Sequence, residues 1–254
     1  MILLHRLTPF VIAASVFGGF TALTLAPLAW LPYAIACFVL VPLLLGRLLL
    51  WEFRRPAFWV FLGTPSLLLI SSVIFFLFLE SDPAKWFLAS IVTLAVGLYA
   101  ENLFTFYHMP NAYQAYALEY LSLVLYVASG FFFTSGAYAS QLFLLLPMWI
   151  PAIAVLVAVF LATIAVFWVS KVGFETGLVY AIAGAVVMAE LYIALSTLPT
   201  SFVTNAATFS VFLYLFLVLS RAQVLDTLHR KMAIRYIATA ATLLAVILGT
   251  ATWL

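Results

Sequence analysis

Residues 147–169 read PMWIPAIAVLVAVFLATIAVFWV and contain no charged side chain. A bilayer with a hydrocarbon core of about 30 Å is crossed by roughly 20 apolar residues in a helix. The run is long enough to meet that requirement. It therefore predicts a transmembrane helix, and the rest of the chain repeats the pattern.

The composition of the whole chain agrees with this interpretation. Of 254 residues, 68% are hydrophobic and 7% are charged, whereas soluble domains have about 45–50% apolar and about 25% charged residues. A soluble fold of this size would leave roughly a quarter of its unfolded surface in water. The expected partner is therefore the lipid bilayer, with other membrane proteins as further candidates. The net charge of +2 is too small to indicate a nucleic-acid partner.

The fold class predicted is all-α, a polytopic integral membrane bundle that forms a single transmembrane domain over residues 1–254. Charged or turn-forming residues separate the apolar runs. The predicted spans are 9–29, 32–51, 57–79, 86–107, 113–134, 147–169, 174–197, 202–220 and 232–253.

Basic residues predict the orientation of this bundle, because lysine and arginine stay on the cytoplasmic side. With a cytoplasmic N-terminus, nine spans and an external C-terminus, one basic residue, Lys85, lies outside. The other nine lie at cytoplasmic ends: Arg6, Arg47, Arg54, Arg55, Lys171, Arg221, Arg230, Lys231 and Arg235. A prokaryotic inner membrane is the predicted location, because the connecting loops are short.

The segment 135–147 is the weak point of this topology. Residues 135–141, SGAYASQ, are too polar for the centre of a span, whereas 142–146 are wholly apolar. The first part is predicted to be an outer loop, and the second a short stretch at the interface or leading into the next span. Eight or ten spans remain alternatives.

Glutamates inside predicted spans are the main candidates for function, because an ionisable group in a bilayer costs several kcal/mol. Glu101 and Glu119 each stand nine positions from Pro110, in the turn between two spans. Helical rise predicts that both lie at a similar depth, about 10 Å from the cytoplasmic side. Polar residues recur at helical spacing around each of them: Gly97, Glu101, Thr105 and His108, and Glu119, Ser122, Tyr126 and Ser129.

The hypothesis drawn from these stripes is one shared polar site. Glu101 and Glu119 would form it, with Asn102, Tyr99, Tyr120 and His108 nearby. Two close carboxylates in a low dielectric share a proton or hold a cation between them. The alternative is that each glutamate bonds separately to a neighbouring helix and stabilises the bundle. Glu190, near the outer third of its span, is a secondary candidate on its own.

Several chemistries are disfavoured by the sequence. Cys37 is the single cysteine, which excludes an internal disulfide and a cysteine-based metal cluster. The two aspartates lie in predicted loops and the three histidines are scattered, so metal-dependent and aspartyl enzymes are disfavoured. No cofactor, metal or catalytic residue is predicted.

Three function classes remain. The first is transport of a cation, proton or small solute through the bundle by the paired glutamates. The second is a non-catalytic membrane partner or assembly subunit, and the third is a lipid-modifying enzyme, which we rank last.

Overall fold

All regular secondary structure in the described part of the chain is helical. The computed structural model describes residues 2–26 and 28–251, with side chains from residue 6 onward. Nine helices in these ranges are long and apolar enough to cross a membrane, which confirms the predicted all-α membrane fold. They are α1 Ile2–Leu25, α2 Leu31–Leu48, α3 Pro56–Phe76, α4 Asp82–His108, α5 Ala117–Leu144, α6 Trp149–Val169, α7 Phe174–Ser196, α8 Phe202–Val224 and α9 Arg230–Thr250, with a 3₁₀ turn η1 at Pro110–Ala112.

Local chemistry explains where several helices begin and end. Proline occupies the first turn of α2, α3 and α4, where its missing N–H costs nothing. Residues Lys171 and Asp226 end α6 and α8 in the left-handed conformation, with φ of 59° and 52°. Beyond them, Val172 N donates to Phe167 O and Thr227 N donates to Ala222 O, both at 3.0 Å. These bonds satisfy carbonyls that a helix end would otherwise leave unpaired.

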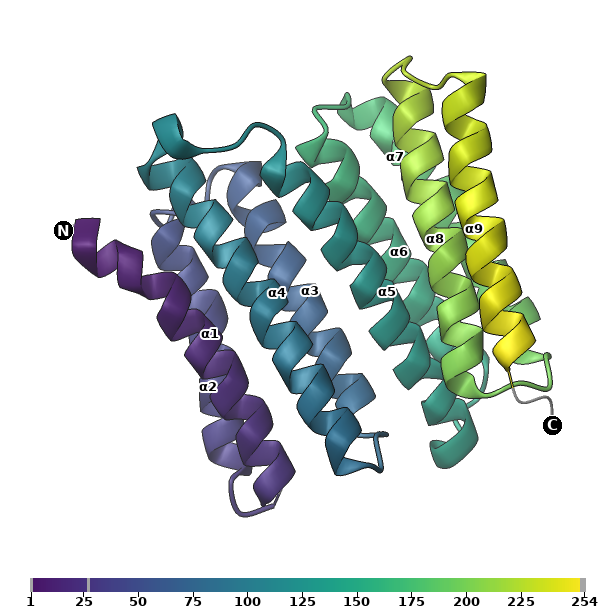
Figure 1. The fold of residues 1–254 in the computed structure, drawn as a ribbon, viewed down its shortest axis with the longest axis horizontal. Helices are drawn as coiled ribbons and strands as arrows, with labels where there is room; N and C mark the ends of the chain where they lie inside the picture. Colours follow the sequence, from purple (N-terminus) through teal and green to yellow (C-terminus); the bar gives the residue numbers. More distant parts are fainter. Residues whose placement is uncertain (1, 27, 252–254) are drawn as a thin grey trace. The chain divides into compact units, whose positions relative to one another are not determined.

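The chain divides into two compact units, Met1–Leu125 and Tyr126–Leu254, and the boundary lies within α5. In the first unit, α1 packs against both α2 and α4, and α3 packs against the same two helices. Successive helices run in opposite directions (Figure 1). The buried side chains are mainly aliphatic and aromatic, as in Ile12, Phe20 and Leu103.

In the second unit, α6 and α7 form the most extensive helix pair, and α8 packs against α7 and α9. The residues of α5 in this unit reach α7 and α8. Tyr138 stacks on Tyr192 of α7, and Gly130 lies against Leu213 of α8. Helix α9 is peripheral, since Ala240 is its one buried residue among those described.

The predicted loop at 135–141 is wrong. Helix α5 continues through this segment to Leu144, and residues 134–139 are all buried. Polar residues are compatible with a transmembrane helix here because they face protein. The small residues of the segment also allow neighbouring helices to approach closely. Hydropathy alone therefore gave a span that ended ten residues too early, at 134 instead of 144.

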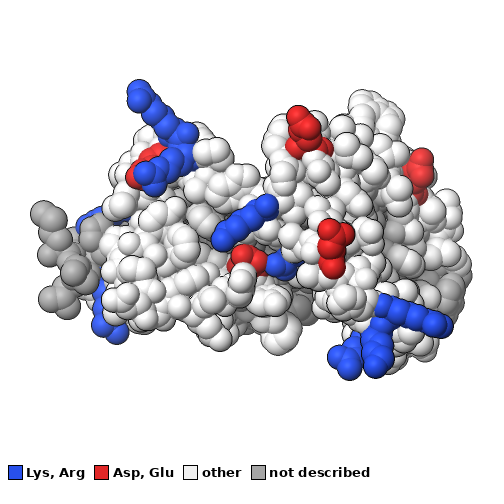
Figure 2. All heavy atoms as spheres, turned by 90° about the horizontal axis from the view of Figure 1, so that it is seen from above, with Lys and Arg blue, Asp and Glu red and all other residues white. Residues whose placement is uncertain are grey.

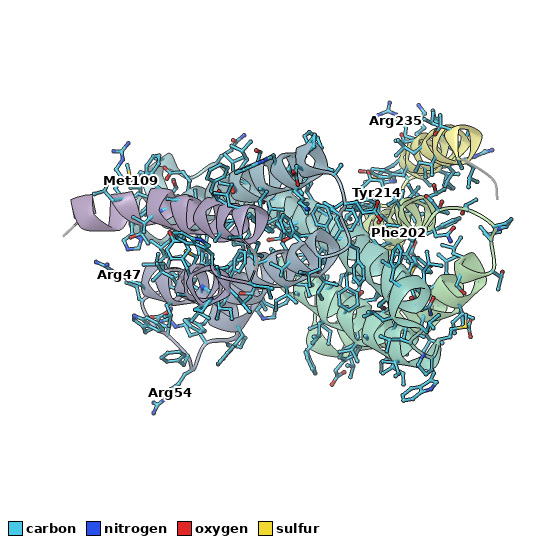
Figure 3. All side chains as sticks on the ribbon, turned by 90° about the horizontal axis from the view of Figure 1, so that it is seen from below. Arg47, Arg54, Met109, Phe202, Tyr214 and Arg235 are labelled. Carbon is cyan, nitrogen blue, oxygen red and sulfur yellow. The ribbon has the colours of Figure 1, made fainter. Side chains whose placement is uncertain are left out.

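Basic residues gather at or near the helix ends within each unit. In the first unit, Arg6, Arg47 and Arg54 lie at the end opposite Lys85, and the second unit has its basic residues at the α6–α7 and α8–α9 connections (Figures 1 and 2). Arg47 and Arg235 extend away from the helices that carry them, and Arg54 extends from the connection between α2 and α3 (Figure 3). This segregation matches the pattern on which the predicted orientation depends.

Candidate functional site

Helix bounds separate the acidic residues into two groups. Six of the eight lie in connections or in the first turn of a helix, namely Glu52, Glu80, Asp82, Glu119, Glu175 and Asp226. The two that remain, Glu101 and Glu190, lie well inside helices. A charged group at a helix end is easily explained in a membrane protein. Glu101 and Glu190 are not at helix ends, so their positions require another explanation.

Glu101 follows Gly97 by four residues on α4, so the two residues share one side of that helix. Gly97, one turn earlier on the same face, approaches α1 so closely that a Cβ on Gly97 would lie 3.2 Å from the Cβ of Ala13. Helices α1 and α4 are antiparallel (Figure 1). A residue one turn after Gly97 on α4 is therefore level with a residue one turn before Ala13 on α1. This register places Glu101 near the level of Pro9 and Thr8.

The α1 side of this crossing contains a break in helical hydrogen bonding. Pro9 lies inside α1 and has no N–H, so it cannot bond to the carbonyl of residue 5. Thr8, its neighbour, is buried. On α4, the hydroxyl of Thr105 donates to the carbonyl of Glu101 at 2.9 Å. Near the level expected for Glu101, α1 therefore has a proline and a buried threonine, and α4 has a threonine hydroxyl bonded to the Glu101 carbonyl.

The charge of Glu101 is not balanced by a nearby cation in the described part of the chain. The ion pairs Arg55–Glu52, at 2.9 Å, and Lys85–Asp82, at 3.3 Å, both lie at helix ends. No described basic side chain lies within 4.0 Å of the Glu101 carboxylate.

Glu119 is much nearer a helix end than the sequence predicted. Helix α5 begins at Ala117, not at 113, because Tyr116 adopts the left-handed conformation and the Tyr113 hydroxyl accepts a hydrogen bond from Leu118 N at 3.1 Å. Glu119 is thus in the first turn, where the helix dipole favours a carboxylate.

The expected equal depth of the two glutamates does not follow from these helix bounds. Glu101 is seven residues from the end of α4, or about 10 Å, whereas Glu119 is two residues from the start of α5, or about 3 Å. The shared site itself stays a prediction.

The remaining predicted site residues are dispersed. Tyr99 is fully buried and, being two residues before Glu101, points to nearly the opposite side of α4. Tyr120 is 63% exposed. The Asn102 side chain donates to Leu98 O of its own helix at 2.8 Å, and His108 stacks on Phe104 with ring centroids 5.1 Å apart.

Glu190 is exposed on α7, about 9 Å before the end of that helix at Ser196. No described basic side chain lies within 4.0 Å of it either. Its exposed neighbours on the same face are apolar, for example Val186 and Ile193. Glu190 belongs to the second compact unit and Glu101 to the first, and a separate role for Glu190 stays a prediction.

A polar contact in the second unit was missed by sequence reasoning. Tyr138 and Tyr192 stack with ring centroids 4.3 Å apart and planes at 17°, and the Tyr138 hydroxyl donates to Tyr192 O at 3.0 Å. The Tyr192 hydroxyl is buried and has no hydrogen-bond partner among the described residues. The signal available in the sequence was the run of small residues around Tyr138, which is typical of a helix interface.

The described residues contain no group of three His, Cys, Asp or Glu side chains placed to hold a metal ion. Cys37 is buried as a free thiol. No protein-family model matches the chain, and comparison with curated proteins and with solved structures finds no match either.

Proposed function

We propose that this integral membrane protein moves a proton, a cation or a small cation-coupled solute across its bilayer, with Glu101 as the group that takes up and releases the positive charge. The observation that carries the proposal is a half-buried carboxyl group, about 10 Å inside α4, with no described basic partner. Intramembrane carboxylates of this kind commonly serve in proton and ion pathways.

The position of Glu101 at the α1–α4 crossing supports this role. Pro9 frees a backbone carbonyl on α1, and Thr8 and Thr105 add hydroxyl groups near the same level. Oxygen atoms of this kind suit a hydrated proton or a hard monovalent cation. Glu119, at the start of α5, stays a second candidate for the same path.

Flux through purified protein in liposomes tests the proposal. Proton entry is followed with an entrapped pH-sensitive dye under a potassium diffusion potential, and sodium and rubidium uptake with radiolabelled ions. We expect flux in the wild type, its loss in Glu101→Gln and its retention in Glu175→Gln, a matched change at an exposed residue in the first turn of α7.

Two results would contradict the proposal in different ways. If the wild type passes neither protons nor either cation, the protein does not transport them. If wild-type flux is present and Glu101→Gln leaves it intact, transport uses another group, and Glu119→Gln becomes the next variant.

A second candidate, a membrane partner or assembly subunit, is supported by α9. This helix packs on α8, and 14 of its 21 residues are exposed. Because Cys37 is buried, Ala241→Cys on α9 would provide a single accessible thiol. Cross-linking of that thiol to one defined polypeptide in native membranes supports the partner role, and cross-linking to none argues against it.

A further inference from the structure

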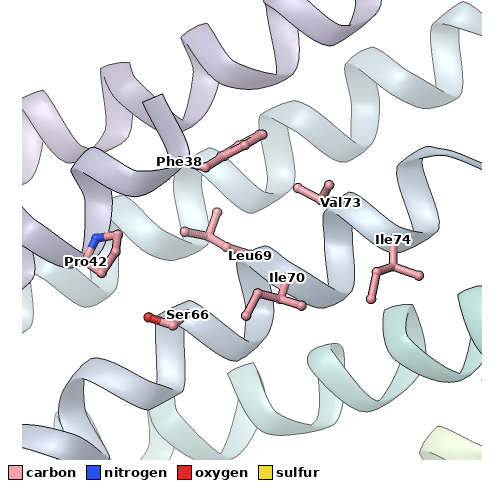
Figure 4. Close-up of a pocket in the computed structure, with 7 residues that line it drawn as sticks. All are labelled: Phe38, Pro42, Ser66, Leu69, Ile70, Val73 and Ile74. Atoms are coloured by element: carbon pink, nitrogen blue, oxygen red, sulfur yellow. The ribbon is translucent and has the colours of Figure 1, made fainter. Parts of the chain in front are cut away.

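The first unit contains an apolar pocket between α2 and α3 that is independent of Glu101. Its volume is about 300 Å³, and it is lined by Phe38, Pro42, Ser66, Leu69, Ile70, Val73 and Ile74 (Figure 4). Leu69 is buried at its base, whereas Ile70 at its rim is 57% exposed. The pocket is therefore a recess open on one side.

The lining offers a ligand almost no polar contact. Ser66 has the one side-chain hydroxyl group among the seven lining residues, and its Oγ already donates to Leu62 O at 2.7 Å. A ligand with a charged or strongly hydrogen-bonding group would lose its hydration there without compensation. The occupant must therefore be apolar along the whole length that enters the pocket.

The depth of the pocket matches one leaflet of a bilayer. Along α3 it extends from Ser66 to Ile74, about 12 Å by helical rise, beginning about 15 Å from the start of the helix. Along α2, Phe38 and Pro42 lie on either side of the middle of the helix. Half of a 30 Å hydrocarbon core is about 15 Å, so the pocket runs from near the midplane toward one surface.

That surface is the end of the first unit that carries Lys85, where α1 is followed by α2 and α3 by α4 (Figure 1). Trp30 and Tyr33 are both exposed at this end, with ring centroids 5.8 Å apart. Exposed tryptophan and tyrosine at a span end are typical of the interface between headgroups and acyl chains.

From the lining, volume and depth together, we propose that this pocket binds one acyl chain of a membrane lipid from the leaflet on the Lys85 side. The terminal methyl group lies near Pro42 and Ser66, and the ester end lies toward Phe38 and Ile74. Moving an acyl chain from the surrounding lipid into the pocket gains no hydrophobic free energy. Binding results instead from close packing, because an unfilled pocket loses dispersion contacts. This inference does not depend on transport.

Lipids with a diazirine at a defined acyl position test the proposal in nanodiscs containing the full-length protein. After illumination, mass spectrometry maps the adducts. We expect a diazirine near the terminal methyl to label Pro42 and Ser66 more than exposed apolar residues of equal depth elsewhere. A diazirine near the ester should shift the labelling toward Phe38 and Ile74.

A pocket-filling variant provides the control. Val73→Phe places a ring in the pocket and should lower this labelling several-fold, whereas Ile182→Phe, at an exposed position on α7, should leave it unchanged. If Val73→Phe does not remain monodisperse, Ile70→Trp at the exposed rim replaces it. Uniform labelling of all apolar surfaces at one depth, or labelling unaffected by both pocket variants, would show ordinary lipid contact and overturn the proposal.

Discussion

At the residue scale, the Tyr138–Tyr192 pair separates two roles of a buried hydroxyl group. The Tyr138 hydroxyl donates to Tyr192 O, whereas the Tyr192 hydroxyl bonds to no described residue. The stacked rings are the same for both residues. Removing one hydroxyl group or the other therefore changes hydrogen bonding and leaves the apolar packing nearly intact.

We expect Tyr138→Phe to lower the free energy of unfolding by about 0.6–1.7 kcal/mol, the range for hydrogen bonds between membrane helices. Tyr192→Phe should be neutral or slightly stabilising, because it removes a buried polar group that has no described partner. Unfolding in mixed detergent micelles measures both. Equal losses in the two variants would show that the Tyr138 bond has no special role.

The left-handed backbone conformation of Lys171 at a helix end allows a second test of stability. Lys171 adopts φ of 59° at the end of α6, a conformation that favours glycine. Lys171→Gly should be more stable than Lys171→Ala by about 1 kcal/mol, since both remove the charge and differ in the Cβ alone. If the two variants unfold at the same denaturant concentration, the φ value does not strain the backbone.

At the element scale, the close contact of α1 with α4 depends on Gly97. A Cβ on Gly97 would lie 3.2 Å from the Cβ of Ala13, which is fixed to the backbone and cannot rotate away. Gly63 of α3 is the natural comparison, because nothing lies within 4 Å of a Cβ built there.

We predict that Gly97→Leu costs about 1–3 kcal/mol of stability through overpacking, and that Gly63→Leu costs little or nothing. If Glu101 acts at the α1–α4 crossing, Gly97→Leu should also reduce flux in liposomes, while Gly63→Leu should not. A stable and fully active Gly97→Leu protein would argue against this crossing as the site.

At the scale of the whole molecule, the distribution of basic residues predicts which end is cytoplasmic. Asp226, between α8 and α9, and Ser81, before α4, are both exposed and lie in connections of opposite predicted side. Cys37 is buried, so a thiol reagent should react slowly with the wild-type protein.

We expect a membrane-impermeant thiol reagent to label Ser81→Cys in intact cells and Asp226→Cys only after the cytoplasmic face is exposed. The physical reason is the retention of lysine and arginine in the cytoplasm during insertion. The opposite labelling would invert the topology and place the acyl-chain pocket in the cytoplasmic leaflet.

The sequence by itself determined that this chain is a helical membrane protein, because each apolar run must satisfy its backbone internally to enter lipid. It predicted nine spans, with eight or ten as alternatives. Most span boundaries could be read in the same way, from charges, prolines and loop residues that interrupt apolar runs. That requirement acts locally, so hydropathy is sufficient to detect it.

Only the tertiary structure decided which polar residues lie inside helices and what they contact. Residues 135–141 resemble a loop in isolation, yet α5 continues through them because α7 and α8 provide partners for its polar and small side chains. Glu119 resembles a deep carboxylate by residue count, yet the Tyr113 contact begins α5 just before it. The close approach of Gly97 to α1 likewise depends on the rotation of α4, which is set by packing between helices distant in sequence.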